Sequence, residues 1–443
     1  MAKETSTLRL MVDRSSSRVV FAESDGHFVD ILMSFLTYPL ATILRLSNKQ
    51  SFGALNKLYE SVESIESHCL RSEACRSMLL QPVCSAAEEC SKLQITNCTL
   101  CSYICSNRSC FYENLSLYAN HQCPCGEFFD RRVCFSQSTQ RSNAGVFVLS
   151  SFRFKISDDL VVSQLSMEEI TALFGQLGVK QGRNLEAMDV TLTAAVIIEL
   201  LKRILVSETP LTDVFLGVPK EKSKMQLKMH STHHNEAQAS GSKESYKASV
   251  MLILNKKDKK LVFAEADNEF VDLLVSYLTY PMGLVMNKLG GTSGNRCFDN
   301  LYKSIESLKS VDCFKGAELM NMLLNPKLPT HLTLEDSFSS SLEHEERFYL
   351  SGTRFYMCRT EGCNSYEVST IGNVSCKGCT KITNKRLKVI EPKDGFMRKS
   401  RFVVMDNLVV KPLSSIVFLT DAFKETLSQV EIMNVEIGAE EVC

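Results

Sequence analysis

The chain has 443 residues, of which 44% are hydrophobic and 23% are charged, a composition typical of a globular protein with two or three domains. Its formal net charge of −1 excludes an overall electrostatic attraction to nucleic acid or to an anionic membrane. The first nine residues contain no apolar core of a secretory signal, so we expect a cytoplasmic or nuclear protein. In a reducing compartment the 18 cysteines are expected to bind metal or stay free.

The chain opens with a predicted β-hairpin. Apolar and polar residues alternate over residues 8–12 and 18–22, on either side of a polar turn. Asp25 then stands where a helix N-cap is expected, ahead of an apolar run over residues 28–46. Polar residues and Pro39 interrupt this run, so it does not fit a membrane span, and we predict a buried helix kinked at the proline.

The rest of the first half alternates between helix and strand patterns. A second amphipathic helix has an apolar face formed by Leu55, Leu58, Tyr59, Val62 and Ile65. A cysteine-rich insert follows. After it we predict strands at 152–156, 160–163 and 188–192, a short helix near 166–177 and a closing helix at 194–206. This mixture of elements predicts an α+β fold.

The same pattern returns in the second half of the chain. Residues 20–39 and 262–281 are identical at 14 of 20 positions, which indicates an internal duplication. We therefore predict two tandem modules, at residues 8–216 and 248–443, joined by a flexible polar linker at 217–247. The second module ends before the equivalent of the closing helix. Either the chain is a truncated variant, or something else covers the apolar surface that this helix would cover.

A four-cysteine array occurs once in each half with nearly the same spacing. Its members are Cys105, Cys110, Cys123 and Cys125 in the first half, and Cys358, Cys363, Cys376 and Cys379 in the second. Thiolate sulfur is the ligand that structural zinc selects, so we predict up to two structural zinc ions, each in a knuckle of its own module. A single residue between Cys123 and Cys125 strains the first site, where Cys98 and Cys101 could substitute. An all-cysteine site has no open position for water, which argues against metal-assisted catalysis.

Two other patterns leave alternatives open. The acids Glu23, Asp25 and Asp30 recur as Glu265, Asp267 and Asp272. They could form an unfamiliar catalytic site, or they could be structural groups at helix starts. We favour the structural interpretation. After the second array come basic residues that could contact nucleic acid, although a basic surface strip without that role is commoner. These residues are Lys377, Lys381, Lys385, Arg386 and Lys388. No histidine recurs between the halves and no phosphate-binding loop is present, so familiar catalytic patterns are absent from the sequence.

The repeated motifs also carry a family resemblance. They include Val20-Phe21-Ala22-Glu23, Phe28-Val29-Asp30, Leu36-Thr37-Tyr38-Pro39, Asn300-Leu301-Tyr302, the cysteine pairs and Leu211-Thr212-Asp213-Val214-Phe215. Together they resemble a plant family known only as domain of unknown function 674. The resemblance covers nearly the whole chain outside the linker and implies an intracellular plant protein, but it brings no activity. We expect a non-catalytic binding or scaffold protein with protein partners and no membrane association. The alternative is a nucleic-acid-associated protein, and an enzyme is the third interpretation.

Overall fold

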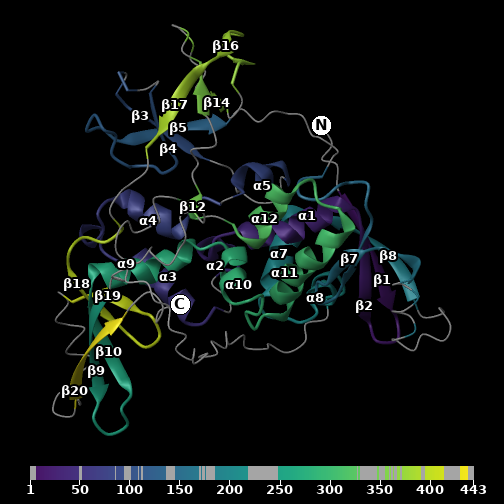
Figure 1. Cartoon of the computed structure of the whole chain (residues 1–443), viewed down its shortest axis with the longest axis horizontal. Coiled ribbons are helices and arrows are strands. Elements are labelled where there is room, and N and C mark those ends of the chain that lie inside the picture. Colours follow the sequence, from purple (N-terminus) through teal and green to yellow (C-terminus); the bar gives the residue numbers. More distant parts are fainter. Residues whose placement is uncertain are drawn as a thin grey trace, which may run out of the picture.

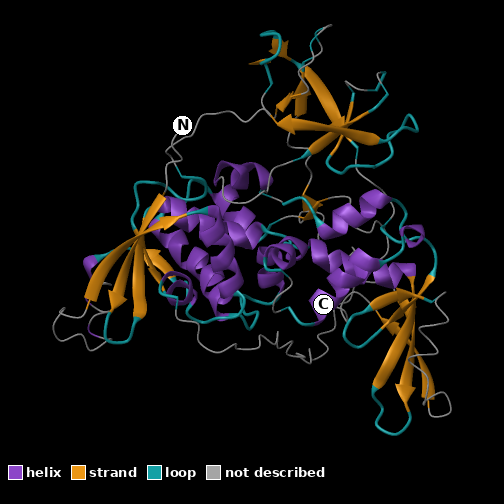
Figure 2. Cartoon of the chain, turned by 180° about the vertical axis from the view of Figure 1, so that it is seen from behind, coloured by secondary structure: helices purple, strands orange, loops and turns teal. Residues whose placement is uncertain are grey.

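The computed structural model contains two antiparallel sheets, a helical layer between them and a small barrel (Figures 1 and 2). It describes residues 6–48, 52–84, 86–93, 101–107, 109–110, 113–135, 145–168, 171, 175, 185–217, 248–326, 328–329, 347–348, 355–358, 360, 363, 367–369, 372–390, 395–413 and 430–437. The predicted linker beyond Gly217 and most of the predicted helix near 166–177 lie outside these ranges. The α+β class is confirmed. None of the helices in the described ranges combines the length and apolarity that crossing a bilayer requires.

The two sheets have the same strand order. The first runs β7-β6-β2-β1-β8 and the second β19-β18-β10-β9-β20, with antiparallel neighbours throughout. The first consists of β1 (Ser6–Asp13), β2 (Arg18–Ser24), β6 (Phe154–Ser157), β7 (Val162–Gln164) and β8 (Leu185–Leu192). The second consists of β9 (Ala248–Asn255), β10 (Leu261–Asp267), β18 (Arg401–Val404), β19 (Val410–Pro412) and β20 (Val430–Ile437). This correspondence accords with the predicted duplication, whose module bounds stay a prediction.

The predicted long helix is broken at Pro39 instead of kinked. Helix α1 (Gly26–Ser34) and a 3₁₀ turn η1 (Phe35–Thr37) end before Tyr38, whose backbone is extended with ψ of 131°. Helix α2 (Leu40–Leu46) begins after the proline. A proline drives the preceding residue out of the helical region and offers no N–H of its own, so the helix stops. The second half repeats this break in α9 (Asn268–Ser276), η4 (Tyr277–Thr279) and α10 (Met282–Lys288).

The two breaks pair with each other. The N–H of Leu40 donates to the carbonyl of Tyr280 at 2.9 Å, and the N–H of Met282 donates to the carbonyl of Tyr38 at 3.0 Å. Leu40 and Met282 occupy equivalent positions in the duplicated sequence, as do the two tyrosines. The contact therefore has the reciprocity of an interface around a two-fold axis, although both sides belong to one chain.

The next helix of each half packs against the sheet of the other half. Helix α3 (Ala54–Ser64) contacts β19, and α11 (Arg296–Leu308) contacts β7 (Figure 1). The hydroxyl of Ser61 accepts the N–H of Val410 at 3.0 Å, and that of Ser304 accepts the N–H of Val162 at 2.9 Å. Other helical elements in the described residues are η2 (Ser67–Cys69), α4 (Glu73–Leu80), α5 (Ala87–Leu93), η5 (Lys309–Val311) and α12 (Ala317–Leu324). Through the contacts of α3 and α11, each half therefore packs a helix against the sheet of the other half.

One hydrophobic core runs through the helical layer and reaches both sheets. Phe28 and Phe35 from the first half and Leu278 and Phe298 from the second are fully buried in it. Burial of such side chains stabilises the fold by about 1.5–3 kcal/mol each relative to full exposure. Because the core is shared, the folding of each half depends on the other.

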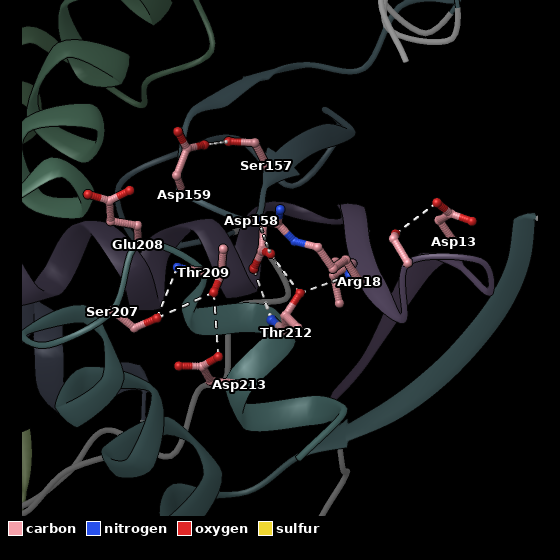
Figure 3. Close-up of polar contacts among 12 residues, drawn as sticks. Asp13, Arg18, Ser157, Asp158, Asp159, Ser207, Glu208, Thr209, Thr212 and Asp213 are labelled. Carbon is pink, nitrogen blue, oxygen red and sulfur yellow. Dashed lines mark hydrogen bonds and ion pairs between the residues drawn. The ribbon is translucent and has the colours of Figure 1, made fainter. Parts of the chain in front are cut away.

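The closing helices of the first half, α7 (Ala194–Ile204) and α8 (Pro210–Phe215), are anchored by a buried polar cluster (Figure 3). The hydroxyl of Thr212 donates to Asp158 Oδ2 at 2.6 Å and accepts the N–H of Val19 at 2.9 Å. The N–H of Thr212 donates to Asp158 Oδ1 at 2.9 Å, and Arg18 Nη2 lies 3.8 Å from Oδ2. In the second half the equivalent Asp406 is exposed.

The two cysteine-rich inserts form one closed six-stranded barrel, which stands apart from both sheets (Figures 1 and 2). The first insert supplies β3 (Ser102–Cys105), β4 (Asn114–Ser116) and β5 (Phe129–Phe135), and the second supplies β13 (Phe355–Met357), β14 (Glu367–Ser369) and β17 (Lys385–Val389). The strand order is β13-β14-β5-β3-β4-β17. Pairs within an insert are antiparallel, whereas the two seams between inserts, β4–β17 and β5–β14, are parallel. Each insert thus contains its own four-cysteine group, and the strands of both inserts together close one barrel. Two short pairs, β11 (Leu328–Pro329) with β12 (Arg347–Phe348) and β15 (Val374–Ser375) with β16 (Ile382–Thr383), complete the strands.

Candidate metal centres

The second four-cysteine array comes together as one cluster. Its members are Cys358, Cys363, Cys376 and Cys379. Cys358 directly follows β13, and the last two cysteines lie in the turn between β15 and β16. The N–H of Cys376 donates to the carbonyl of Lys381 at 2.8 Å, which closes this turn. The Sγ atoms of Cys358 and Cys379 are 3.4 Å apart, and those of Cys363 and Cys376 are 3.6 Å apart.

The first array forms an equivalent cluster of Cys105, Cys110, Cys123 and Cys125. The Sγ atoms of Cys105 and Cys125 are 3.5 Å apart. A tight turn after Cys123 brings the closely spaced pair together, because the N–H of Gly126 donates to the carbonyl of Cys123 at 2.8 Å. Gly126 has a φ of 95°, a conformation that a glycine adopts without strain. The single-residue spacing therefore does not keep these two cysteines out of one cluster.

The sulfur positions fit a four-coordinate metal ion. In each cluster all ligand atoms lie within 4.8 Å of one another. Bonds of about 2.3 Å from zinc to sulfur in a tetrahedron place the sulfurs about 3.8 Å apart. The observed pairs at 3.4 to 3.6 Å are close to that value. Each cluster could therefore hold one metal ion after small adjustments.

One thiol in each cluster ionises readily. A backbone hydrogen bond from Glu127 lowers the pKa of Cys125 to about 7, and one from Lys381 lowers the pKa of Cys379 to about 6. Burial has the opposite effect on Cys105 and raises its pKa to about 12. Thiolate is the form of cysteine that binds metal, so a lowered pKa makes Cys125 and Cys379 better ligands near neutral pH.

Cys101, from the extra cysteine pair near the first array, does not belong to the cluster that the described residues form. The sulfur of Cys101 accepts a hydrogen bond from Arg132 Nη2 at 3.0 Å. Cys98 lies outside the described residues. Sequence reasoning missed another neighbour of the first cluster, Asn114, whose side-chain Nδ2 donates to Cys123 Sγ at 3.7 Å. No spacing rule would have identified it, because it belongs to the start of β4.

Two of the repeated acids cap helices. Asp25 accepts the N–H of His27 at 3.0 Å, at the start of α1. Asp267 accepts the N–H groups of Glu269 and Phe270 at 3.1 and 3.0 Å, at the start of α9. The predicted capping role is confirmed for both, and the carboxylates are positioned by the helix N-terminus as that role requires.

The buried acids Asp30 and Asp272 bind backbone loops. Asp30 accepts three N–H groups, from residues 146–148, and Asp272 accepts two, from residues 396–397. Burial raises the pKa of Asp30 to about 6 and that of Asp272 to about 7. Each bound loop forms a β-bridge with the other half, Val148 to Phe314 and Leu70 to Met397. These acids therefore help to join the halves.

The predicted basic residues lie together on the second-half side of the barrel. They are Lys377, Lys381, Lys385, Arg386 and Lys388. Arg386 and Lys388 are exposed on β17, on either side of the buried Leu387. Tyr356 on β13 pairs with Arg386, and Lys377 and Lys381 are exposed in the turn of the second cluster. Lys385 is half-buried, so four of the five residues can reach a ligand in solvent.

Sequence reasoning also missed an exposed apolar side chain at each cluster. Phe128 is 50% exposed and Ile382 is 58% exposed. Each follows the last cysteine of its array by three residues. This shared spacing after Cys125 and Cys379 is the signal that could have revealed them. Phe128 forms a β-bridge with Gln122 and Ile382 begins β16, so both apolar side chains face solvent just after a cysteine turn.

The fold and the clusters define an α+β protein with two candidate four-cysteine metal centres on a shared barrel. No curated protein and no solved structure matches the chain. The chain belongs to the family described as protein of unknown function (DUF674), whose model matches residues 2–440. The resemblance stated from the sequence is thus confirmed, and the family brings no activity to the chain.

Proposed function

We propose that this protein is a non-catalytic binding protein of the cytoplasm or nucleus, whose barrel is stabilised by two structural zinc ions. The observation that carries the proposal is that four cysteine sulfurs lie within 4.8 Å of one another in each cluster. All-cysteine sets favour zinc among divalent cellular metals, and four protein ligands leave no position for a reacting water. The capping and loop-binding contacts of the repeated acids support structural roles for them over catalytic ones.

Metal content tests this proposal first. We expect two zinc ions per chain by elemental analysis of protein purified without added metal. Chelation should then lower the melting temperature, because metal binding and folding are coupled at such sites. The variant Cys376→Ser should lose one ion and melt earlier, whereas Cys101→Ser, outside both clusters, should keep two. A chain with no metal and all 18 thiols free contradicts the proposal.

A protein partner is the ligand that we assign to the barrel. Phe128 and Ile382 present apolar side chains to solvent just after the cysteine turns, at the same spacing in both arrays. A metal-clamped turn is already ordered, so binding loses less conformational entropy. The double variant Phe128→Ser, Ile382→Ser should keep its metal and melting temperature but lose partners that the parent captures. Capture of the same partners by both proteins would contradict this assignment.

Nucleic acid is the second candidate ligand, and the pairing of Tyr356 with Arg386 beside Lys388 favours it. An aromatic ring next to basic side chains can stack on a base while the cations contact phosphates. Phosphate contacts make affinity fall with salt, by a slope of about 0.7 per contact for single strands on logarithmic axes.

Charge reversal on the strand tests the nucleic-acid candidate. Arg386→Glu with Lys388→Glu should abolish the salt-dependent binding of single-stranded RNA by the full chain. Lys57→Glu, at an exposed residue of α3 in the helical layer, is the matched control and should not. Binding that is absent in the parent, or unchanged by the barrel variant, removes this candidate.

A further inference from the structure

Each cysteine cluster is attached to strands that pair with the other insert. In the β4–β17 seam, the N–H of Lys388 donates to the carbonyl of Glu113 at 2.8 Å, and that of Ile390 donates to the carbonyl of Leu115 at 2.7 Å. Residues 113–115 lie between Cys110 and Cys123 of the first cluster, and β17 follows Cys379 of the second. A strand within the first array is therefore hydrogen-bonded to the strand that follows the second array.

The second half also forms part of the wall of the first cluster. Cys105, Cys123 and Phe129 make a small buried core, and Ile390 packs against it. Asn114 connects this core with the seam, because its backbone pairs opposite Lys388 while its side chain donates to Cys123 Sγ. The first cluster is thus complete only when β17 is in place.

The β5–β14 seam makes the equivalent connection in the other direction. Cys134 pairs with Glu367, and Phe135 pairs with Val368, which is fully buried. Strand β5 follows Cys125, and β14 follows Cys363. A closed barrel has no free edge, so opening either seam exposes unpaired backbone groups of both inserts. Ordering of the strands around one cluster can therefore stabilise the strands around the other cluster through either seam.

We propose that the two clusters bind metal with positive coupling, so that metal in one cluster raises the affinity of the other. The inference rests on the proposed function, because it requires that both clusters bind metal. Binding fixes four sulfur positions and orders the strands attached to them. When β17 is ordered, Ile390 packs against the first cluster and the backbone of β17 pairs with β4. The second ion therefore binds to a cluster whose surroundings are already in place.

Cobalt(II) titration of the full-length chain tests the coupling, since sulfur–cobalt absorption reports occupancy. In the parent, occupancy should rise more steeply than for two independent sites. Cys376→Ser should lower the cobalt affinity of the first cluster, by about 5–150-fold if the coupling has its usual size. Coupling free energies are reciprocal, so Cys123→Ser should lower the affinity of the second cluster by the same factor.

Two further variants keep the test independent of misfolding. Ile390→Ala retains all eight cluster cysteines and alters only the wall, and it should weaken the first cluster. Cys101→Ser lies outside both clusters and should change neither affinity. Equal affinity of a cluster with and without its neighbour would overturn the coupling while leaving the zinc sites intact. Failure of the parent to bind cobalt at all would overturn the proposed function as well.

Discussion

Replacing Asp272 with asparagine should remove the pH-dependent loss of folding stability that the buried carboxyl group causes. The N–H groups of Phe396 and Met397 both donate to one oxygen of this acid, Oδ1, at 3.0 and 2.8 Å. Asparagine keeps an oxygen there and places its amide where the second carboxyl oxygen was. The variant therefore resembles the protonated acid, which retains both hydrogen bonds without a buried charge.

The size of the effect follows from the pKa of Asp272. Burial, the main cause, raises this pKa from 3.8 to about 7 in the folded state. For an acid whose folded pKa is raised, the contribution to stability is present below the unfolded pKa and is lost as pH rises through the folded pKa. Three pKa units at 1.36 kcal/mol each amount to about 4 kcal/mol lost between about pH 4 and about pH 8.

Urea unfolding of parent and variant across this pH range measures the difference. The stability of the parent relative to Asp272→Asn should fall by about 4 kcal/mol from low to high pH, and contributions common to both proteins cancel. Asp30→Asn is the matched comparison. Asp30 uses both oxygens, Oδ2 for Val146 and Oδ1 for residues 147–148, so the new amide would face the N–H of Val146. This variant should lose about 1–3 kcal/mol even at low pH. Parallel stability curves for the parent and Asp272→Asn would refute the reasoning.

Three other outcomes test the packing. Gly283→Ala should destabilise the chain by about 1–3 kcal/mol in thermal unfolding, because overpacking strains a tight contact. Its Cβ would lie 2.3 Å from the carbonyl oxygen of Leu323, and an unchanged melting temperature would contradict that contact. Thr212→Val removes a hydroxyl from Asp158 and should lower stability by about 1–3 kcal/mol in urea. A chain cleaved at a protease site inserted within residues 218–247 should elute as one particle in size exclusion, and separate halves would contradict the exchange of helices.

Much of the local structure could be predicted from the sequence. The alternation around the first turn predicted the hairpin, and Asp25 predicted the start of α1, because side-chain periodicity and capping act over a few residues. The repeated cysteine spacing predicted which four sulfurs share a cluster, including the closely spaced pair of Cys123 and Cys125. The identity between residues 20–39 and 262–281 predicted the repeat, and the matching strand orders of the two sheets accord with it.

The tertiary structure decided where the repeated pieces pack. Pro39 predicted a disturbance in a helix, yet only the fold shows that the break pairs with its counterpart through the bonds of Leu40 to Tyr280 and Met282 to Tyr38. The same holds for Ser61, whose hydroxyl binds a strand of the other half, and for the two inserts that close one barrel. The matching segments 20–39 and 262–281 carry similar apolar faces, so local sequence does not indicate whether each packs on its own half or on the other. That choice depends on the shared core, on the paired seams and on the distance that the connecting segments must span, and these are properties of the whole chain.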